Sequence, residues 1–261
     1  MSSRPLAVVT GASSGIGRAF ARRLAADGHD VALVARDRTR LEALAGELRE
    51  AHGIRAEVWP ADLADAAASR GVAERIAAAD DLDVLVHAAG FLHVGALETL
   101  DPEREDEAVR LMAGATVRLA RAALPKLLER GHGSIVVVSS GPAFTPSAKD
   151  NATYAACKAF VNHFVLSLAE RVRGTGVRAL AVCPGNTRTE IFERAGLDMR
   201  ELPESAWSTP EQVVDEALRE LEAGANLCVP GERGRDVTLR RLLPRRLLAK
   251  ASGILRRLSR T

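Results

Sequence analysis

The stretch LAVVTGASSGIGRAFARRLAADGHDVALVAR, residues 6–36, decides the fold of this chain. It begins with a short apolar run, Leu6–Thr10, and passes through a glycine-rich turn into a helical pattern from Ile16 to about Asp27. A second apolar run covers residues 30–36. The order strand, glycine turn, helix and strand predicts a βαβ unit, in which the two strands lie parallel in one sheet.

The same alternation of strand-like and helix-like segments continues along the chain. Further strands are expected within residues 55–60, 82–90, 134–140, 177–185 and 225–230. Further helices are expected over residues 38–53, in a segment that ends at Ile76, and from about Thr153 to Arg173. The strands are nearly continuous runs of Val, Ile, Leu and Ala, which is typical of a parallel sheet covered on both faces. The sequence therefore predicts an α/β, doubly wound sheet of about seven mostly parallel strands, with ligands bound at their carboxyl ends.

Composition places the chain among soluble globular proteins. It has 261 residues, of which 47% are hydrophobic and 27% are charged, and this length suits one large α/β domain. We find neither a signal-peptide pattern nor an apolar stretch long enough to span a bilayer. Three cysteines without a CxxC pair argue against a disulfide framework and against a zinc site. We therefore expect a cytoplasmic protein without a bound metal.

Charge divides the chain into a mildly acidic body and a strongly basic tail. Residues 231–261 carry ten Lys and Arg against two Asp and Glu, a net charge of +8, whereas residues 1–230 carry 26 against 32, a net charge of −6. We expect a single domain over residues 1–230 and an amphipathic helical tail over residues 231–261. The tail can pack on the body or on a second subunit, close over the substrate, or make weak peripheral contact with a membrane. Nucleic-acid binding is not expected from an acidic body without interleaved aromatic residues.

The turn TGASSGIG, residues 10–17, carries the first candidate ligand-binding residues. Its glycines allow backbone N–H groups to approach a phosphate, and the start of the next helix favours negative charge. The spacing G-xxx-G-x-G differs from the usual dinucleotide fingerprint, and no GK[ST] ending marks a nucleotide-triphosphate loop. A tight turn without a ligand is the alternative interpretation. The candidate cofactor-binding residues of this turn are Thr10, Gly11, Ser13, Ser14, Gly15, Ile16 and Gly17.

Two charged residues at predicted strand ends bear on the choice of cofactor. An acidic residue about 20 positions after the glycines would bind the ribose hydroxyls of NAD, but here the residue is Arg36. A guanidinium suits a 2′-phosphate, so NADP(H) is favoured over NAD(H). Asp62, after the third strand, can accept a hydrogen bond from an adenine amino group or cap the following helix.

The most informative pair of residues is Tyr154 and Lys158. Tyr154 is the only tyrosine in the chain, and Lys158 lies one helical turn further along the same face. A phenol with a pKa near 10 is a poor acid–base group at neutral pH, and an adjacent ammonium is expected to lower that pKa. Ser140 ends the fifth predicted strand, where its hydroxyl can meet the phenol at the carboxyl edge of the sheet. These three residues are the predicted catalytic group.

Taken together, the motifs resemble those of the short-chain dehydrogenase/reductase family over about residues 4–231. The matching markers are TGASSGIG, Asp62-Leu63, Ala89-Gly90, Ser140, YAACK from Tyr154, Pro184-Gly185 and Thr189. The resemblance implies a Rossmann-type fold, a nicotinamide cofactor, and hydride exchange with a carbonyl or alcohol, here a ketone or secondary alcohol. It also implies a homodimer or homotetramer that assembles through the helix bearing Tyr154.

The family's substrate-covering segment lies after Pro184-Gly185, where this chain has apolar residues, so we expect a small to medium, partly apolar substrate; core or interface packing explains these residues equally well. The apolar residues are Ile191, Phe192, Met199, Leu202 and Trp207.

The resemblance assigns roles to individual residues. Tyr154 would protonate or deprotonate the substrate oxygen, Lys158 would lower its pKa and hold the nicotinamide ribose, and Ser140 would position the oxygen. Thr189 would lie near the nicotinamide carboxamide. The remaining cofactor-binding residues implied outside the glycine turn are Arg36, Asp62, Leu63, Ala89, Gly90, Pro184, Gly185 and Thr187.

The chain departs from the family pattern in several places. The family's NNAG is HAAG here, with His87 in place of an asparagine that ties neighbouring strands, and we expect this histidine to be structural. The family's catalytic asparagine falls at Met112, whose side chain cannot bind a relay water, although its backbone carbonyl can. Asn162, one turn beyond Lys158, is expected on the helix surface or at an interface. A cofactor-binding scaffold and a non-redox dehydratase or isomerase remain as alternative functions.

Overall fold

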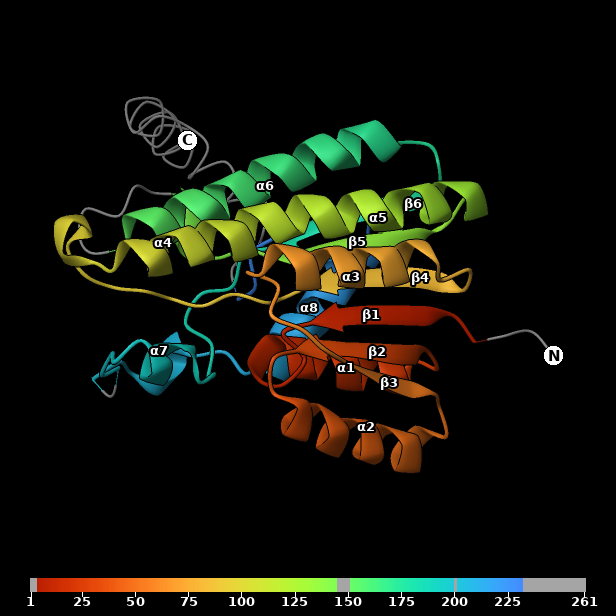
Figure 1. Cartoon of the computed structure of the whole chain (residues 1–261), viewed down its shortest axis with the longest axis horizontal. Coiled ribbons are helices and arrows are strands. Elements are labelled where there is room, and N and C mark those ends of the chain that lie inside the picture. The colour runs from red at the N-terminus through yellow and green to blue at the C-terminus, as the bar shows by residue number, and fades with distance from the viewer. Residues whose placement is uncertain (1–3, 145–150, 200, 232–261) are drawn as a thin grey trace, which may run out of the picture.

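Seven parallel strands form one sheet in the computed structural model, which describes residues 4–144, 151–199 and 201–231 (Figure 1). The strand order is β3-β2-β1-β4-β5-β6-β7. The strands are β1 Leu6–Thr10, β2 Asp30–Ala35, β3 Ala56–Pro60, β4 Leu82–His87, β5 Gly133–Val138, β6 Val177–Val182 and β7 Leu227–Cys228. This order and direction confirm the predicted doubly wound α/β fold, while the predicted helical tail lies outside the described residues.

Helices cover both faces of the sheet. The helices α1 Gly15–Ala26, α2 Arg38–His52 and α8 Pro210–Glu222 pack on one face, and α3 Ala66–Ala77, α5 Ala115–Arg130 and α6 Ala152–Val172 pack on the other. In Figure 1, α3, α5 and α6 lie in the upper half of the molecule, at or above the height of β4 and β5, and α1 and α2 lie in the lower half with β2 and β3. The shorter elements are η1 Leu97–Thr99, α4 Pro102–Val109, the π-helical turn η2 Arg110–Gly114, η3 Gly141–Phe144, α7 Ile191–Arg194 and η4 Glu204–Ala206.

Burial on both faces explains why the central strands are apolar throughout. All five residues of β1 are buried. Val9 and Leu33 belong to the apolar core beneath α1, α2 and α8, whereas Val8 and Val34 belong to the core beneath α3, α5 and α6. Successive side chains of a strand point to opposite faces, so a strand buried between two helical layers needs apolar residues at every position.

Local signals set the limits of α2 as the sequence predicts. The Asp37 side chain accepts a hydrogen bond from the backbone N–H of Arg40, and Gly53 ends the helix with a left-handed φ of 59°. Asp37 is a common residue at the start of a helix and Gly53 at its end, because each helps to satisfy backbone groups that have no partner inside the helix.

The carboxyl ends of the strands face one side of the molecule, where α7 projects beyond the sheet on the left of Figure 1. β1 pairs with β2 on one side and with β4 on the other, so the direction of winding reverses between β1 and β4. Doubly wound sheets bind ligands at this reversal point.

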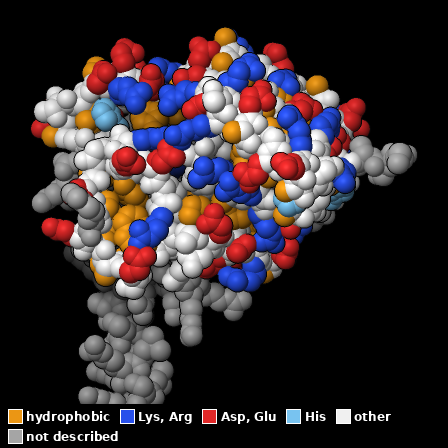
Figure 2. Space-filling view, turned by 90° about the horizontal axis from the view of Figure 1, so that it is seen from below, with side chains coloured by type: hydrophobic (Ala, Val, Ile, Leu, Met, Phe, Trp, Pro, Cys, Tyr) orange, Lys and Arg blue, Asp and Glu red, His pale blue; other side chains and the backbone are white. Residues whose placement is uncertain are grey.

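Acidic and basic side chains are interspersed over the face seen in Figure 2, and larger apolar areas lie toward its left, the end that carries α7 in Figure 1. Among the described residues no helix is long and apolar enough to cross a membrane.

Candidate active site

The glycine turn brings the chain from β1 into α1 with very little space for side chains. A Cβ atom at Gly17 would lie 2.3 Å from the backbone oxygen of Gly11, so only glycine fits there. Ser14 stands at the N-cap of α1, but its side chain makes no capping hydrogen bond. The first N–H groups of α1 are therefore not capped by this side chain and lie at the positive end of the helix, an arrangement that suits a phosphate.

The side chain of Thr10, at the start of this turn, points toward the end of β4. Its Oγ1 accepts hydrogen bonds from the backbone N–H groups of Ala88 at 3.1 Å and Ala89 at 3.2 Å, and lies 2.8 Å from Nδ1 of His87. The side chain of Thr10 thus fixes the turn to β4, and only its backbone is left to face a ligand.

Arg36 and Asp62 come together at the carboxyl ends of β2 and β3. Nη1 of Arg36 lies 3.8 Å from Oδ2 of Asp62, and both side chains are largely exposed. Asp62 accepts a hydrogen bond from the backbone N–H of Ala64, whereas the helix α3 is capped by Asp65. Of the two roles considered for Asp62, capping of α3 is therefore wrong. Leu63 is buried in the core, 4% exposed.

The structure brings Ser140, Tyr154 and Lys158 together beside the end of β5. Ser140 follows β5 and hydrogen-bonds the Tyr154 phenol through its hydroxyl. Lys158 Nζ donates to the backbone oxygen of Val138 at 2.9 Å and lies 5.6 Å from the centre of the Tyr154 ring. Ser139 donates to the backbone oxygen of Lys158 at 3.0 Å, which fixes this turn of α6 to the strand.

Burial dominates the electrostatics of this group. It raises the pKa of Tyr154 above its usual value, and the hydrogen bond from Ser140 acts in the opposite direction. Burial also lowers the pKa of Lys158 to about 8. The expectation that Lys158 lowers the pKa of Tyr154 below the ordinary phenol value is therefore wrong for this structure, because desolvation of the buried phenol outweighs the favourable contacts.

Gly90 and Met112 complete the surroundings of the Lys158 ammonium. A Cβ atom at Gly90 would lie 3.5 Å from Lys158 Nζ and 3.6 Å from Cγ and Sδ of Met112. Met112 is buried in the π-helical turn, and its backbone oxygen accepts a hydrogen bond of 2.6 Å from the Thr116 hydroxyl. The Met112 carbonyl, expected to be available to a relay water, thus already accepts a hydrogen bond from within the protein.

The segment after β6 lies over the glycine turn. Thr189 packs against Gly15, where an added Cβ would lie 2.9 Å from Cγ2 of Thr189. The next residue, Glu190, accepts two contacts of 2.9 and 3.0 Å from Nη1 of Arg40 on α2. The sequence does not predict this ion pair between the segment and α2, because Arg40 and Glu190 are 150 positions apart and neither belongs to a recognisable motif.

Further along, the same segment carries an aromatic pair. Phe192 and Trp207 meet edge to face with ring centres 5.6 Å apart, and the guanidinium of Arg188 lies over the Trp207 ring. Pro184, Gly185 and Thr187 lead into this segment, and the Thr187 hydroxyl donates to the backbone oxygen of Gly185 at 3.2 Å.

Asn162, expected on the helix surface or at an interface, is instead buried within the chain. It is 7% exposed, and its Oδ1 accepts a hydrogen bond of 3.2 Å from the Cys183 thiol. The helix α6 is packed so closely against β6 that even this polar position is covered. Among the described residues no group of three or more His, Cys, Asp and Glu could hold a metal ion.

Comparison with known proteins agrees with this arrangement. The family model for short chain dehydrogenases matches residues 5–200. The chain belongs to the short-chain dehydrogenase/reductase family.

The chain is similar to several members of this family, two of them in solved structures. A short-chain dehydrogenase of Sphingobium yanoikuyae in complex with NADPH is 33% identical, with a TM-score of 0.85 over 96% of this chain and 94% of that one. An alcohol dehydrogenase of Comamonas testosteroni, specific for bulky-bulky ketones, is 30% identical with a TM-score of 0.81, over 97% and 94%. A short-chain dehydrogenase of Pseudocercospora fijiensis (strain CIRAD86) is 37% identical over 71% of this chain and 60% of that protein. Members of this family are NAD(P)-dependent oxidoreductases that act on alcohols and ketones.

Proposed function

We propose that the chain is an NADP(H)-dependent reductase of ketones, or dehydrogenase of secondary alcohols, with a partly apolar substrate. The observation that carries this proposal is the meeting of Ser140, Tyr154 and Lys158 at the carboxyl edge, beside the uncapped start of α1. A phosphate-binding turn and an acid–base group on one edge are the two parts that nicotinamide-dependent reduction requires.

The residues of the edge fit a dinucleotide. The glycine turn offers backbone N–H groups for the pyrophosphate, Arg36 offers a guanidinium for a 2′-phosphate, and Gly90 leaves open the space beside Lys158. When bound, NADPH supplies the hydride. The proposed cofactor-binding residues are Thr10, Gly11, Ser13, Ser14, Gly15, Ile16, Gly17, Arg36, Asp62, Leu63, Ala89, Gly90, Tyr154, Lys158, Pro184, Gly185, Thr187 and Thr189.

The chain's own residues would handle the proton. Because burial raises the pKa of Tyr154, its phenol is protonated at neutral pH and is ready to donate to a carbonyl oxygen. Ser140 already hydrogen-bonds the phenol oxygen and is placed to hold the substrate oxygen next to it. Lys158, with a pKa of about 8, is mostly charged at neutral pH, and its charge stabilises the phenolate that remains after proton transfer.

Apolar side chains near this group support a partly apolar substrate. Phe91 and Leu92 pack against the cluster that contains Met112 and Tyr154. The specificity of the Comamonas testosteroni relative for bulky ketones supports the same class of substrate.

The full chain, incubated with NADPH and a panel of aliphatic, aromatic and cyclic ketones, tests this proposal. We expect NADPH oxidation on part of the panel, and a fall in kcat of at least about 100-fold in Tyr154→Phe, because the phenyl ring cannot donate a proton. NADPH binding, followed by fluorescence, is expected to be similar in both proteins. Product formation without net cofactor turnover would instead indicate a non-redox enzyme, and tight binding without any product would indicate a scaffold.

The preference for NADP(H) is tested by Arg36→Asp. The change removes the proposed partner of the 2′-phosphate and introduces a carboxylate that suits ribose hydroxyls. We expect the Kd for NADPH to rise by at least about tenfold while the Kd for NADH changes little or falls. Equal losses for the two cofactors would remove Arg36 as the determinant.

We further propose that residues 1–230 act as one catalytic domain and that two or four copies assemble through α5 and α6. Phe160 of α6 is 42% exposed and stacks on Phe164 at 6.0 Å, and Val117 of α5 is 37% exposed. Such apolar side chains on neighbouring helices favour contact with a second copy. Analytical ultracentrifugation of the full chain measures the assembly state. Cytoplasmic localisation and weak membrane contact of residues 231–261 remain predictions from the sequence.

A further inference from the structure

Glu190 is a partly buried carboxylate at the carboxyl edge that the proposed function leaves without a task. It precedes α7, and Nη1 of Arg40 on α2 lies 2.9 and 3.0 Å from its two oxygens. Arg194, one turn further along α7, donates to the same carboxylate. The hydrogen bond from Arg40 and the charges of both guanidinium groups hold the pKa of Glu190 below its usual value. The side chain is therefore charged throughout the neutral pH range.

The α7 segment, residues 187–194, carries Glu190 past the glycine turn. Its first residue, Thr187, is buried and forms a parallel bridge with the chain just before α8. Thr189 then lies against Gly15, the first residue of α1, where an added Cβ would be 2.9 Å from Cγ2 of Thr189. The backbone thus anchors the segment at Thr187, and the side chain of Glu190 anchors it on the other side of Thr189.

Arg40 is a firm anchor because it belongs to the first turn of α2. Its backbone N–H donates to Oδ1 of Asp37 at 3.0 Å, and its Nε lies 3.5 Å from Oδ2 of the same carboxylate. Leu41 and Leu44 bury the following turns of α2 in the apolar core. The ion pair with Glu190 therefore joins the α7 segment to a helix that is fixed to the sheet.

We propose that Arg40 and Glu190 are positioning residues whose ion pair keeps the α7 segment closed on the start of α1 and sets the rates at which NADP(H) enters and leaves. The part that concerns the cofactor rests on the proposed function, whereas the closure of the segment does not. Thr189 lies against the residue at which the pyrophosphate is proposed to bind, so the segment has to lift before phosphate groups reach or leave the N–H groups of α1.

The ion pair is expected to act on rates and not on affinity. Both of its partners belong to the chain, so the pair stabilises the closed segment equally with and without a cofactor beneath it. A contact that favours two states equally does not shift the equilibrium between them. Opening of the segment precedes entry as well as exit, so breaking the pair accelerates both.

A direct contact between Arg40 and the 2′-phosphate predicts a different result. Arg36, the proposed partner of that phosphate, stands only four positions earlier in the chain. If Arg40 bound the phosphate as well, Glu190 would compete for its guanidinium. Loss of the Arg40 charge would then weaken NADPH binding, and loss of the Glu190 charge would strengthen it. Closure by the ion pair predicts changes of the same sign for the two residues.

The test uses Arg40→Met, Glu190→Gln and the double variant in the full chain, with Arg40→Lys as the conservative variant that keeps the positive charge. Glu47→Gln is the matched control, because it breaks a pair of the same kind and similar exposure between α1 and α2, in which Arg22 nitrogens lie 2.8 and 2.9 Å from the Glu47 oxygens. Exposed ion pairs contribute little to stability, so all variants are expected to fold, and melting temperatures verify this.

The first readout is stopped-flow fluorescence of NADPH, with association followed directly and dissociation followed by displacement with excess NADP⁺. We expect both rate constants to rise by about 3–10-fold in each single variant, with the Kd changing by less than about twofold. The two substitutions shift the net charge in opposite directions, so a rise in both cannot come from long-range attraction of the cofactor. The double variant is expected to match the single variants, because either change alone breaks the pair. Arg40→Lys and Glu47→Gln are expected to stay within about twofold of the wild type.

The second readout, hydrogen exchange followed by mass spectrometry without cofactor, does not depend on NADPH binding. The backbone N–H groups of Arg188 and Arg194 each donate a hydrogen bond of 2.9 Å, so their exchange reports opening of the α7 segment. We expect peptides over residues 187–194 to exchange at least about threefold faster in the two single variants than in the wild type or the control.

Faster rates at a constant Kd, together with faster exchange, support the proposal. Unchanged exchange in both single variants, or additive rate effects in the double variant, overturns it. Kd values that move in opposite directions overturn it in favour of a direct contact between Arg40 and the 2′-phosphate. If the wild type binds no NADPH, the proposed function fails, and exchange alone decides whether the ion pair closes the segment.

Discussion

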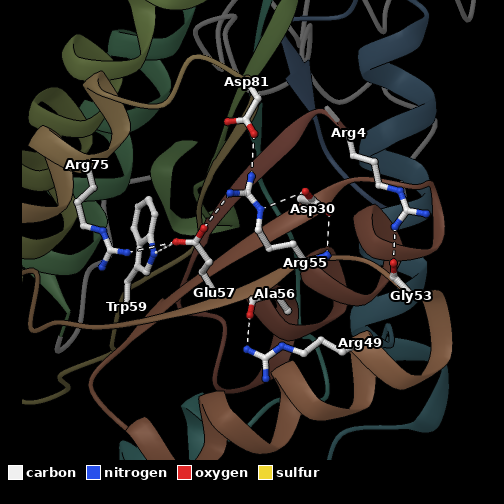
Figure 3. A network of polar contacts seen from close by, with 10 residues as sticks. All are labelled: Arg4, Asp30, Arg49, Gly53, Arg55, Ala56, Glu57, Trp59, Arg75 and Asp81. Carbon is white, nitrogen blue, oxygen red and sulfur yellow. Dashed lines mark hydrogen bonds and ion pairs between the residues drawn. The ribbon is translucent and has the colours of Figure 1, made fainter. Parts of the chain in front are cut away.

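The amino edge of the sheet and the candidate catalytic group at its carboxyl edge use charged side chains in opposite ways. At the amino edge, guanidinium and carboxylate groups pair with one another in an extended network (Figure 3). At the carboxyl edge, the ammonium of Lys158 is buried with a backbone carbonyl as its hydrogen-bond partner, and α1 begins without a side-chain cap. The same strands connect the two edges, so the contrast lies in the side chains placed at their ends.

Arg55 is the centre of the network at the amino edge. Its guanidinium contacts the carboxylates of Asp30 at 3.1 Å, Asp81 at 2.7 Å and Glu57 at 3.2 Å (Figure 3). Glu57 also accepts a hydrogen bond of 2.9 Å from the indole of Trp59. These contacts connect the starts of β2 and β3 with the segment that precedes β4, and they contribute to stability.

A hollow of about 540 Å³ lies at this amino edge, yet it does not resemble an active site. Its walls include Arg55, Glu57, Trp59 and Arg75, whose polar groups already bond to one another. The carboxyl edge holds a buried charge and a crowded glycine turn instead. In this molecule, a buried charged side chain without an ionic partner therefore indicates the candidate active site better than the volume of a hollow does.

The largest effect of any substitution considered is expected for Gly17→Ala, in the glycine turn at the carboxyl edge. The new Cβ would lie 2.3 Å from the Gly11 carbonyl, so the turn must deform, and NADPH affinity is expected to fall by more than about 100-fold. The matched control is Gly46→Ala on α2, where a Cβ meets nothing within 4 Å, and which is expected to raise stability by about 0.5–1 kcal/mol.

Fluorescence titration with NADPH and urea denaturation check this pair. Tight NADPH binding by Gly17→Ala would mean that the turn does not hold the phosphates. A loss of stability in Gly46→Ala would mean that clashes with a Cβ are not what distinguishes the two positions.

A smaller effect is expected at the first residues of two helices. The Thr209 hydroxyl caps α8 and accepts a hydrogen bond from the Gln212 backbone at 3.2 Å, so Thr209→Ala is expected to cost about 1 kcal/mol and leave kcat unchanged. Ser14 makes no such bond, so Ser14→Ala is expected to leave the stability of the cofactor-free protein within about 0.3 kcal/mol. Urea denaturation without cofactor measures both, and an equal cost in the two variants would remove the contrast between the helix starts.

Local patterns in the sequence are sufficient to predict much of the fold. The apolar period of α2, its Asp37 cap and its final Gly53 all lie within 17 consecutive residues. Tyr154 and Lys158 are only one helical turn apart. The sequence signal is weaker over residues 102–130. Only Ala108 of α4 is buried, so the helix shows little apolar period, and the π-helical turn then shifts the phase before α5 begins.

The features of the site that local sequence patterns do not predict depend on contacts between distant segments. His87 meets Thr10 across 77 positions, and only the register between β1 and β4 brings them together. The sign of the pKa shift of Tyr154 was wrong because burial of the phenol depends on the surrounding packing, which a motif does not contain. Asn162 was misplaced for the same reason.

The measurement that tests the contrast most directly is the free energy of unfolding of Lys158→Met and Arg55→Met between pH 6 and 10. Lys158 has a pKa of about 8 in the folded chain and near 10.4 when unfolded, so between these values the unfolded chain binds more protons. The free energy of unfolding of the wild type should therefore gain a rising contribution from about pH 8 to 10.

Lys158→Met lacks that contribution and is expected to be more stable than the wild type at pH 7, by roughly 1–3 kcal/mol, with an advantage that shrinks above pH 8. Arg55→Met is expected to be less stable by about 1–2 kcal/mol, because it leaves three carboxylates without their shared partner at a half-exposed site. Opposite signs at pH 7 are the result that this account predicts. A Lys158→Met variant that is no more stable than the wild type, or an Arg55→Met variant that loses nothing, would contradict it.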